Sequence, residues 1–249
     1  MISKNKIKYI TSLQKKKYRQ KYNKFVIEGH KTVFDIIDSD YIIEEIYTSN
    51  AENYKIQLAK LSEVVTEVSD EDLRKISGLS NANDILAVVN IPETPEYISN
   101  TNELTLCLAD IQDPGNLGTI IRSANWFGIK NIVCSNNTVD LFNPKTLQST
   151  MGAFSNINVY YKNLEQFLEQ EKGKKIYGTF LEGENIYQTE LAQECILIMG
   201  NEGKGIPENL NKYISDKITI PSFAGENLKA ESLNVSISTA VFLSEFKRR

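Results

Sequence analysis

Three clusters of glycine and polar residues that could do chemistry lie in the last 134 residues of this 249-residue chain. They read NLGTIIRSANWFG from residue 116, IMGNEGKGI from residue 198 and ESLNVS from residue 231. Each cluster follows or overlaps an apolar run, which is where loops leaving a buried sheet form ligand sites. Any one of them could also be ordinary turn chemistry.

The first cluster contains Arg122, which we expect near the start of a helix. Ile120, Ile121, Ala124 and Phe127 would form the buried face of that helix, so Arg122 would project from another face. The helix dipole opposes a cation near this end, so the position calls for an explanation. An anionic substrate supplies one, because a guanidinium binds phosphate through two parallel hydrogen bonds. A purely structural turn and helix is the alternative.

The second cluster has three glycines within six residues, Gly200, Gly203 and Gly205, which allow a ligand to approach the backbone closely. It is not a P-loop, because its Gly-Lys pair is followed by Gly205 and not by Ser or Thr. Its glycine spacing also differs from the dinucleotide fingerprint. An adenosine-type cofactor loop and a plain tight turn before Pro207 are the two readings left open.

The third cluster opens the last helix of the chain. Ser232 is a natural N-cap for that helix, and capping alone could explain it. Asn234 would fall in the first turn, where its poor helix propensity predicts a side-chain partner.

The elements that must position these clusters form two α/β parts. In the first part we expect a basic helix at 4–20, strands at 24–28, 42–47, 64–68 and 85–90, a break at Gly29, a helix at 52–61 and a helix capped by Asp70. In the second part, near-continuous apolar runs predict strands buried on both faces, hence a mainly parallel sheet. These runs are 104–111, 131–134, 157–161, 175–180, 195–199 and 217–220. Residues 92–103 are polar, contain proline and read as a linker, which divides the chain into 1–91 and 104–249.

Composition limits the class of protein. With 41% apolar and 24% charged residues and no apolar run near the length of a membrane span, we expect a globular cytoplasmic protein without a membrane partner. Cys107, Cys134 and Cys195 lie in apolar segments, and their odd number predicts buried free thiols. A single histidine and the absence of a Cys-x-x-Cys pair argue against a metal site.

The charge is unevenly distributed along the chain. The net charge is −4, yet residues 1–24 contain nine Lys and Arg residues and no acid. Tyr9, Tyr18 and Tyr22 are interleaved with them, a combination that suits phosphate contact and base stacking. The cations that we assign to RNA binding are Lys15, Lys16, Lys17, Arg19, Lys21 and Lys24. A solvated terminal helix is the equally weighted alternative.

Taken together, the three clusters resemble the signature motifs of the SpoU (TrmH-like) RNA ribose 2′-O-methyltransferases of the SPOUT superfamily. The resemblance covers about residues 104–246, and the stretch STMGA at 149–153 is similar to a fourth family element. Residues 18–29 resemble the L30e-like substrate-binding domain that many members carry. The resemblance implies an L30e-like domain at 1–91 and a SPOUT catalytic domain at 104–249 with a deep trefoil knot.

The same resemblance implies an S-adenosylmethionine-dependent activity and a homodimer formed by the knotted domain. By position, Arg122, Asn116, Glu202, Ser232 and Asn234 match the family's catalytic residues. The positions that match its cofactor site are Gly200, Asn201, Glu202, Gly203, Gly205, Ile220, Ser232, Leu233 and Asn234.

Two features depart from the family pattern: a longer segment at 222–231 and Gln148 where many members have arginine. By analogy we expect ribosomal RNA as the substrate, with transfer RNA as the nearest alternative. A non-catalytic RNA-binding protein of the same fold is a further alternative, and an NTPase is disfavoured because the glycine loop lacks a P-loop's Lys-hydroxyl pair.

Overall fold

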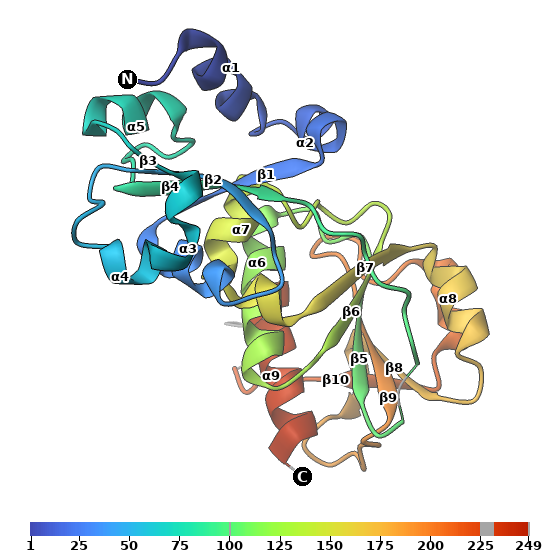
Figure 1. The fold of residues 1–249 in the computed structure, drawn as a ribbon. Coiled ribbons are helices and arrows are strands. Elements are labelled where there is room, and N and C mark those ends of the chain that lie inside the picture. The colour runs from blue at the N-terminus through green and yellow to red at the C-terminus, as the bar shows by residue number, and fades with distance from the viewer. Residues whose placement is uncertain (100, 225–231, 249) are drawn as a thin grey trace. The chain divides into compact units, whose positions relative to one another are not determined.

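The computed structural model describes residues 1–99, 101–224 and 232–248. The chain forms two compact units (Figure 1). Unit 1 comprises residues 1–93 together with 142–155, and unit 2 comprises 94–141 together with 156–249. The segment 142–155 therefore belongs to unit 1, whereas the sequence places it inside a continuous second part.

Unit 1 is built on a four-stranded sheet in the order β1-β4-β2-β3. Strand β4 is antiparallel to both β1 and β2, and β3 is parallel to β2. The predicted alternation of strands and helices is confirmed. Its elements are α1 (Lys4–Ser12), α2 (Lys16–Tyr22), β1 (Lys24–Glu28), α3 (His30–Ile37), β2 (Ile43–Thr48), α4 (Lys55–Leu58), the 3₁₀ helix η1 (Ala59–Val64), β3 (Val65–Glu67), α5 (Asp70–Ile76), β4 (Ile85–Asn90) and α7 (Pro144–Thr150).

Two local expectations for unit 1 are wrong. The single basic helix is two helices, because the chain turns at 13–15 and the Arg19 guanidinium donates to the carbonyls of Leu13 and Gln14 at 3.1 and 2.9 Å. These carbonyls at the end of α1 have no partner within the helix, so the arginine satisfies them. The N-cap of α5 is Ser69 and not Asp70, since the Ser69 hydroxyl accepts the Asp72 N–H.

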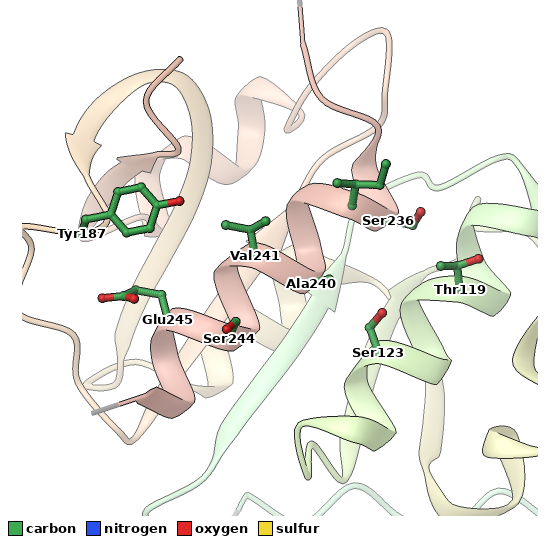
Figure 2. A pocket seen from close by; sticks show the side chains of 9 residues that line it. Thr119, Ser123, Tyr187, Ser236, Ala240, Val241, Ser244 and Glu245 are labelled. Carbon is green, nitrogen blue, oxygen red and sulfur yellow. The ribbon is translucent and has the colours of Figure 1, made fainter. Parts of the chain in front are cut away.

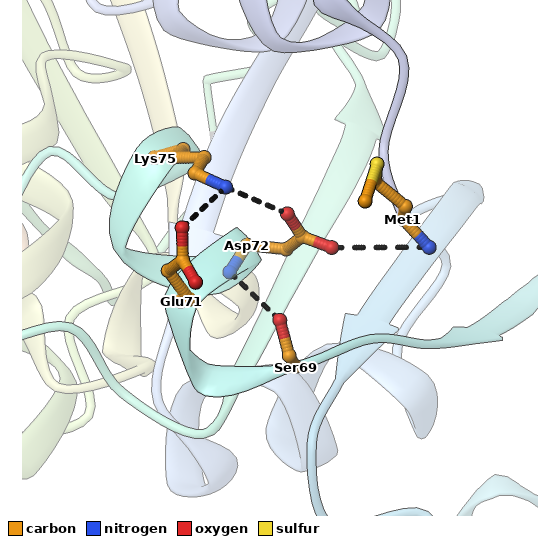
Figure 3. Close-up of polar contacts among 5 residues, drawn as sticks. All are labelled: Met1, Ser69, Glu71, Asp72 and Lys75. Carbon is orange, nitrogen blue, oxygen red and sulfur yellow. Dashed lines mark hydrogen bonds and ion pairs between the residues drawn. The ribbon is translucent and has the colours of Figure 1, made fainter.

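One face of this sheet is covered by α1 and α5. Ile10 of α1 and its C-cap residue Leu13 pack with Leu73 and Ile76 from α5 against Val88. The start of the chain is fixed to the same helix, with the Met1 amino group 3.8 Å from Asp72, which also pairs with Lys75 at 3.2 Å (Figure 3). The Lys75 hydrogen bond lowers the pKa of the Asp72 carboxyl. The basic N-terminal segment is therefore a packed part of unit 1.

An aromatic cluster accounts for the assignment of 142–155 to unit 1. The Phe25 ring of β1 lies 4.6 Å from Phe142 and 6.0 Å from Phe154, measured between centroids. Tyr41 contacts Phe154 edge to face at 5.4 Å. Phe25 and Phe154 are fully buried, so this segment supplies part of the unit's core.

Unit 2 is built on a six-stranded sheet in the order β10-β8-β9-β5-β6-β7, and all its pairs are parallel. The predicted parallel sheet is confirmed. Its elements are β5 (Leu104–Leu108), α6 (Pro114–Trp126), β6 (Asn131–Ser135), β7 (Asn158–Lys162), α8 (Leu164–Gln170), β8 (Lys175–Asn185), β9 (Cys195–Met199), the 3₁₀ helix η3 (Glu208–Tyr213), β10 (Asp216–Thr219) and α9 (Val235–Arg248). A further 3₁₀ turn, η2 (Ala153–Asn156), ends at the boundary between the units.

Helices cover both faces of this sheet, with α8 on one side and α6 and α9 on the other (Figure 1). Phe167 and Leu168 of α8 pack in one buried cluster with Cys107 and Ile198. Side chains alternate along a strand, so Leu106 and Leu108 face the opposite side. The near-continuous apolar strands are thus explained by burial on two faces.

The three cysteines are free and buried, which confirms the prediction made from their apolar surroundings. Burial raises the pKa of the Cys107 and Cys195 thiols to about 12. No helix in the described ranges has both the length and the apolar character that crossing a membrane requires.

Candidate active site

Strand register brings the first two clusters to one edge of the sheet in unit 2. Leu108 at the end of β5 lies opposite Met199 at the end of β9, and the Ala109 N–H donates to the Met199 carbonyl at 2.9 Å. The chain moves outward from β5 to β6 and β7 on one side, and β8, β9 and β10 lie on the other. The carboxyl ends of β5 and β9 therefore form a topological switch point, where open α/β sheets bind ligands.

At this edge three predicted catalytic residues are joined by hydrogen bonds. Asn116 Nδ2 donates to Glu202 Oε1 at 2.6 Å, and Asn234 Nδ2 donates to Asn116 Oδ1 at 3.0 Å. Their positions in the chain are 86 and 118 residues apart. We call Asn116, Glu202 and Asn234 the amide–carboxylate cluster. It contains one residue from each of the three motifs.

Asn234 caps α9, and Ser232 does not. Asn234 Oδ1 accepts the N–H of Ser236 at 2.9 Å and that of Ile237 at 3.4 Å, and its carbonyl accepts the first helical bond from Ser238. The expectation that Ser232 is the N-cap is therefore wrong, because the helix begins two residues later. The predicted side-chain partner of Asn234 is found: its oxygen faces the helix and its nitrogen reaches Asn116. Ser232 itself is exposed and makes no hydrogen bond to the cluster in the described ranges.

Arg122 lies in the second half of α6, not at its start. The helix begins at Pro114, after the N-cap Asp113, so Arg122 is its ninth residue and the argument from the helix dipole does not apply. On α6, Ile120 and Ile121 are buried, whereas Asn116 is half-buried and Arg122 is exposed. Six residues separate them, or about 9 Å along the axis. Within the described ranges Arg122 is exposed and makes no hydrogen bond or ion pair, so its guanidinium is available to a ligand.

The glycine loop of the second motif is closed on itself. Asn201 N–H donates to the Gly205 carbonyl at 3.0 Å, and Gly205 N–H donates back at 2.8 Å. A Cβ on Gly200 would lie 2.4 Å from the Gly205 carbonyl carbon, so only glycine fits there. Gly203 and Gly205 are exposed, with open space or only ordinary contact where a Cβ would point. A ligand can therefore approach the outer surface of this loop closely.

Two further predicted cofactor positions flank the same sheet edge. Ile220 directly follows β10 and is half-buried, and Leu233 precedes Asn234 and is exposed. Because β10, β8 and β9 are parallel, Ile220 leaves the sheet at the edge that carries the glycine loop. Of the longer segment 222–231, residues 225–231 lie outside the described residues.

In unit 1 the predicted RNA-binding cations fall into two groups. The side chains of Lys15, Lys16, Lys17 and Lys21 are exposed and have no acidic partner among the described residues. Arg19 is only 2% exposed and holds the turn between α1 and α2, so its assignment to RNA binding is corrected to a structural role. Lys24 pairs with Glu44 on β2. Gln148 is exposed on α7.

Several residues of the site were not found from the sequence. Asp110, after β5, adopts a left-handed conformation with φ of 59° and bonds to Ser135, which in turn contacts Thr138. Asp at positive φ is uncommon but tolerated, so no sequence pattern marks it. Asn201, assigned from the sequence to cofactor binding, directs its side chain into the loop and to the Asp110 carbonyl.

A groove of about 450 Å³ was also missed, and it lies along α6 and α9 (Figure 2). Thr119 and Ser123 line it from α6, one and two turns after Asn116, and Ala240 and Val241 line it from α9. Small side chains along two adjoining helices are the signal that could have indicated it. The exposed Trp126 lies one turn beyond Ser123 on the same side of α6.

Comparisons with known proteins agree with this geometry. Residues 103–244 match the SpoU rRNA Methylase family, and residues 4–87 match the MRM3-like substrate binding domain. The chain is 33% identical over 241 residues to the 23S rRNA (guanosine(2553)-2′-O)-methyltransferase RlmP of Bacillus subtilis, which covers 96% of this chain and 94% of that protein.

Solved structures are similar over the whole chain. A putative RNA methyltransferase of the TrmH family from Porphyromonas gingivalis has a TM-score of 0.87 at 35% identity and covers 100% of this chain and 99% of its own. An AdoMet-bound rRNA methyltransferase from Sinorhizobium meliloti has a TM-score of 0.87 at 28% identity, covering 100% and 97%. The family match spans more than half of the chain, and the arrangement of the three motifs fits it. The chain belongs to the SpoU rRNA methylase family.

Proposed function

We propose that this protein transfers a methyl group from S-adenosylmethionine to a ribose 2′-hydroxyl of ribosomal RNA. The observation that carries the proposal is the amide–carboxylate cluster beside the exposed glycine loop at the switch point of a parallel sheet. RlmP of Bacillus subtilis, to which this chain is similar, is named as a 2′-O-methyltransferase of 23S rRNA.

The residues at this edge fit the cofactor. Gly203 and Gly205 are exposed and have no side chain, so a ligand can approach the loop closely, and Ile220 and Leu233 add apolar surface on either side. These groups would hold the adenosine part through close packing on the loop and apolar contact. When bound, the cofactor supplies a methyl carbon on a positively charged sulfur, the leaving group of an in-line displacement.

Arg122 is proposed to position the acceptor. Arginine is a poor base in proteins, so we do not assign removal of the hydroxyl proton to Arg122. Its free charge instead suits a clamp on the neighbouring phosphate and stabilises the alkoxide that develops on the 2′-oxygen. The phosphate helps to accept the proton, while the amide–carboxylate cluster and Ser232 orient the ribose and the loops.

The decisive experiment for this proposal is a single-turnover methylation assay with ribosomal RNA and labelled cofactor. Arg122→Ala is expected to lower the rate by about 10²-fold or more, in the range found when one charge-stabilising donor is removed. The residue is exposed and alanine favours a helix, so the fold should be retained. Near wild-type methylation by Arg122→Ala would contradict the assigned role.

The RNA species is tested separately. Ribose methylation is mapped in ribosomal and transfer RNA from cells with and without the protein. We expect a 2′-O-methyl group that disappears from ribosomal RNA only. Loss from transfer RNA would establish the alternative substrate, and no loss from either, together with no cofactor binding, would indicate a non-catalytic RNA-binding protein.

We propose that α2 is the main RNA contact of unit 1. Lys15, Lys16, Lys17 and Lys21 give it four charges that no acid among the described residues neutralises. Tyr18 and Tyr22 lie one turn apart with ring planes 14° from parallel, a surface on which an unpaired base can stack. A cytoplasmic location is proposed with it, since the buried thiols are free.

We also propose that two copies pair through the α6–α9 groove. The groove combines small side chains with the exposed Ile237 (56% exposed) and lies beside Trp126 (84% exposed), apolar surface that a second copy would cover. A two-fold interface uses the same patch on both copies, which a groove along two helices permits. The trefoil knot stays a prediction, since the segment leading into α9 includes residues 225–231.

A further inference from the structure

The side chain of Asn201 fills the interior of the glycine loop. Its Oδ1 accepts the N–H groups of Gly203 and Lys204, both at 3.0 Å. Its Nδ2 donates to the Asp110 carbonyl at 2.8 Å, on the segment that follows β5. One side chain thus shapes the loop after β9 and ties it to the neighbouring strand.

The anchor at Asp110 is itself held firmly. The Asp110 N–H donates to Ser135 Oγ at 2.9 Å, and Ser135 Oγ donates back to Asp110 Oδ1 at 2.7 Å. Ser135 also lies 3.0 Å from Thr138 Oγ1, and both of these residues are buried. These bonds stabilise the left-handed backbone of Asp110, which would otherwise be unfavourable. Asn201 therefore reaches a carbonyl that is fixed to β6.

The residue after Asn201 is Glu202, which accepts the hydrogen bond from Asn116 in the amide–carboxylate cluster. An amide oxygen has two acceptor positions, and in Asn201 both are used within the loop. A direct cofactor contact by this oxygen is therefore disfavoured. The side chain acts on the ligand through the loop that it shapes.

We propose that Asn201 is a positioning residue, which braces the glycine loop against the end of β5 so that its main chain and Glu202 face the bound ligand. This role rests on the proposed function in so far as the ligand is S-adenosylmethionine. The hydrogen bonds among Asp110, Ser135 and Thr138 hold in place the carbonyl to which Asn201 is bonded.

The test compares Asn201→Asp, Asn201→Ala and the wild-type protein. Asn201→Asp keeps the acceptor for Gly203 and Lys204 but places a charged oxygen against the Asp110 carbonyl, where wild type has a donor. We expect the Kd for S-adenosylmethionine to rise by about tenfold or more, because a hydrogen bond is replaced by repulsion. RNA affinity should stay within about twofold of wild type, because α2 is untouched. The matched control is Asn163→Asp, at the N-cap of α8, where only the side-chain oxygen is used by the Gln166 N–H.

Measuring the cofactor Kd at acidic pH distinguishes the proposed positioning role of Asn201 from a general destabilisation of the protein. Protonation gives the carboxyl introduced by Asn201→Asp an O–H donor, so the ratio of mutant to wild-type Kd should shrink as the pH falls toward the carboxyl pKa. Asn201→Ala has no group to protonate and should show a ratio that does not change with pH. A cofactor Kd for Asn201→Asp equal to that of wild type, or the same pH-independent defect in both variants, would overturn the proposal.

A second measurement is independent of the cofactor. In Asn201→Ala the amide hydrogens of Gly203 and Lys204 lose their acceptor, so their exchange with solvent should accelerate by about tenfold while exchange in α8 is unchanged. If the wild-type protein does not bind the cofactor, the proposed function fails. The exchange experiment still tests whether Asn201 holds the glycine loop in place. Unchanged exchange at both amides would overturn this role.

Discussion

At the scale of single residues, the site depends on side chains that use both of their polar ends. Asn234 caps α9 with its oxygen and reaches Asn116 with its nitrogen. Asn116 in turn donates to Glu202. Each amide has its orientation determined by two partners, so a change of one donor to an acceptor affects the next residue along.

Asn234 permits a test that separates capping from catalysis. Asn234→Asp keeps the acceptor at the start of α9, so the free energy of unfolding should change little, but it faces Asn116 Oδ1 with a second oxygen. Methylation should fall by about tenfold or more, since the Asn116 amide oxygen would face a carboxylate oxygen in either orientation of the amide. Asn234→Ala should lose both roles and about 1 kcal/mol of stability. Urea unfolding and single-turnover assays measure the two effects.

The control for this pair is Asn143→Asp at the N-cap of α7, where the side-chain oxygen accepts the Lys145 N–H. It should retain wild-type activity, because it lies outside the cluster. Full activity in Asn234→Asp would show that the contact with Asn116 has no part in the reaction.

The cysteines give a second prediction at this scale. Burial raises the pKa of Cys107 and Cys195 to about 12, and that of Cys134 is raised as well. The reactive form of a thiol is the thiolate, so at pH 8 the native protein should be almost inert toward a disulfide reagent. Ellman titration should count no thiols in the native protein and three in denaturant. Rapid modification of the native protein would contradict their burial.

At the scale of elements, the N-terminal helices combine a packing side with a charged side. Ile10 and Leu13 are fully buried, and Lys6 pairs with Glu45 at 2.6 Å. Deleting residues 1–24 would therefore remove part of the core of unit 1 together with its charge. Point substitutions on the exposed side are the appropriate test of RNA binding.

Replacing Lys15, Lys16, Lys17 and Lys21 by alanine should weaken RNA binding and reduce its salt dependence. Removal of one phosphate contact lowers the slope of log K against log salt by about 0.7 to 0.9. Binding measured between 50 and 200 mM salt, roughly, gives that slope. Unchanged slope in the fourfold variant would contradict the assignment of α2.

Three single variants accompany the fourfold variant. Lys24→Ala should leave the slope unchanged, because the Lys24 amine already pairs with Glu44. Arg19→Ala should lower the free energy of unfolding by about 1.5–3 kcal/mol, as expected for a buried charge-assisted hydrogen bond. Lys16→Ala, on the exposed side of the same helix, should stay within about 0.5 kcal/mol of wild type.

At the scale of the whole molecule, the chain leaves unit 2 after residue 141 and returns to it at residue 156. The six-stranded sheet brings all three motifs to one edge, and the groove on α6 and α9 begins beside them. Association through that groove would place a second copy close to the amide–carboxylate cluster.

The fluorescence of Trp126 can be used to follow formation of the predicted dimer, because Trp126 is the only tryptophan in the chain. Dilution of the wild-type protein should shift Trp126 emission to the red as the exposed monomer forms, and light scattering should show the mass halving. Ile237→Asp should be monomeric, since the two-fold axis brings two charges into one apolar interface. Ile56→Asp is the control, an exposed isoleucine of α4 in unit 1. A wild-type protein that is monomeric at every concentration would contradict this interface.

Local pattern was sufficient for much of the fold. The apolar runs of unit 2 became β5 to β10 with shifts of a few residues at their ends, and Gly29 ends β1 with a φ of 95°. The sequence also marked the three motifs from which Asn116, Glu202 and Asn234 come together, because glycine loops and polar residues after apolar strands are visible in sequence. Their roles in catalysis and cofactor binding stay predictions. Burial on two faces and turn chemistry are properties of a short window of residues, so a sequence shows them directly.

Other features were decided only by tertiary structure. The burial of Arg19 depends on the chain turning back at 13–15, and the bond from Asn201 to Asp110 depends on β9 lying beside β5. Likewise Asn234, rather than Ser232, caps α9, where its nitrogen reaches Asn116 from 118 residues away. The sequence by itself determined the elements and the residue types of the site. Which of those residues meet was determined by the parallel strand order, since hydrogen-bond partners distant in the chain are selected by packing and not by local propensity.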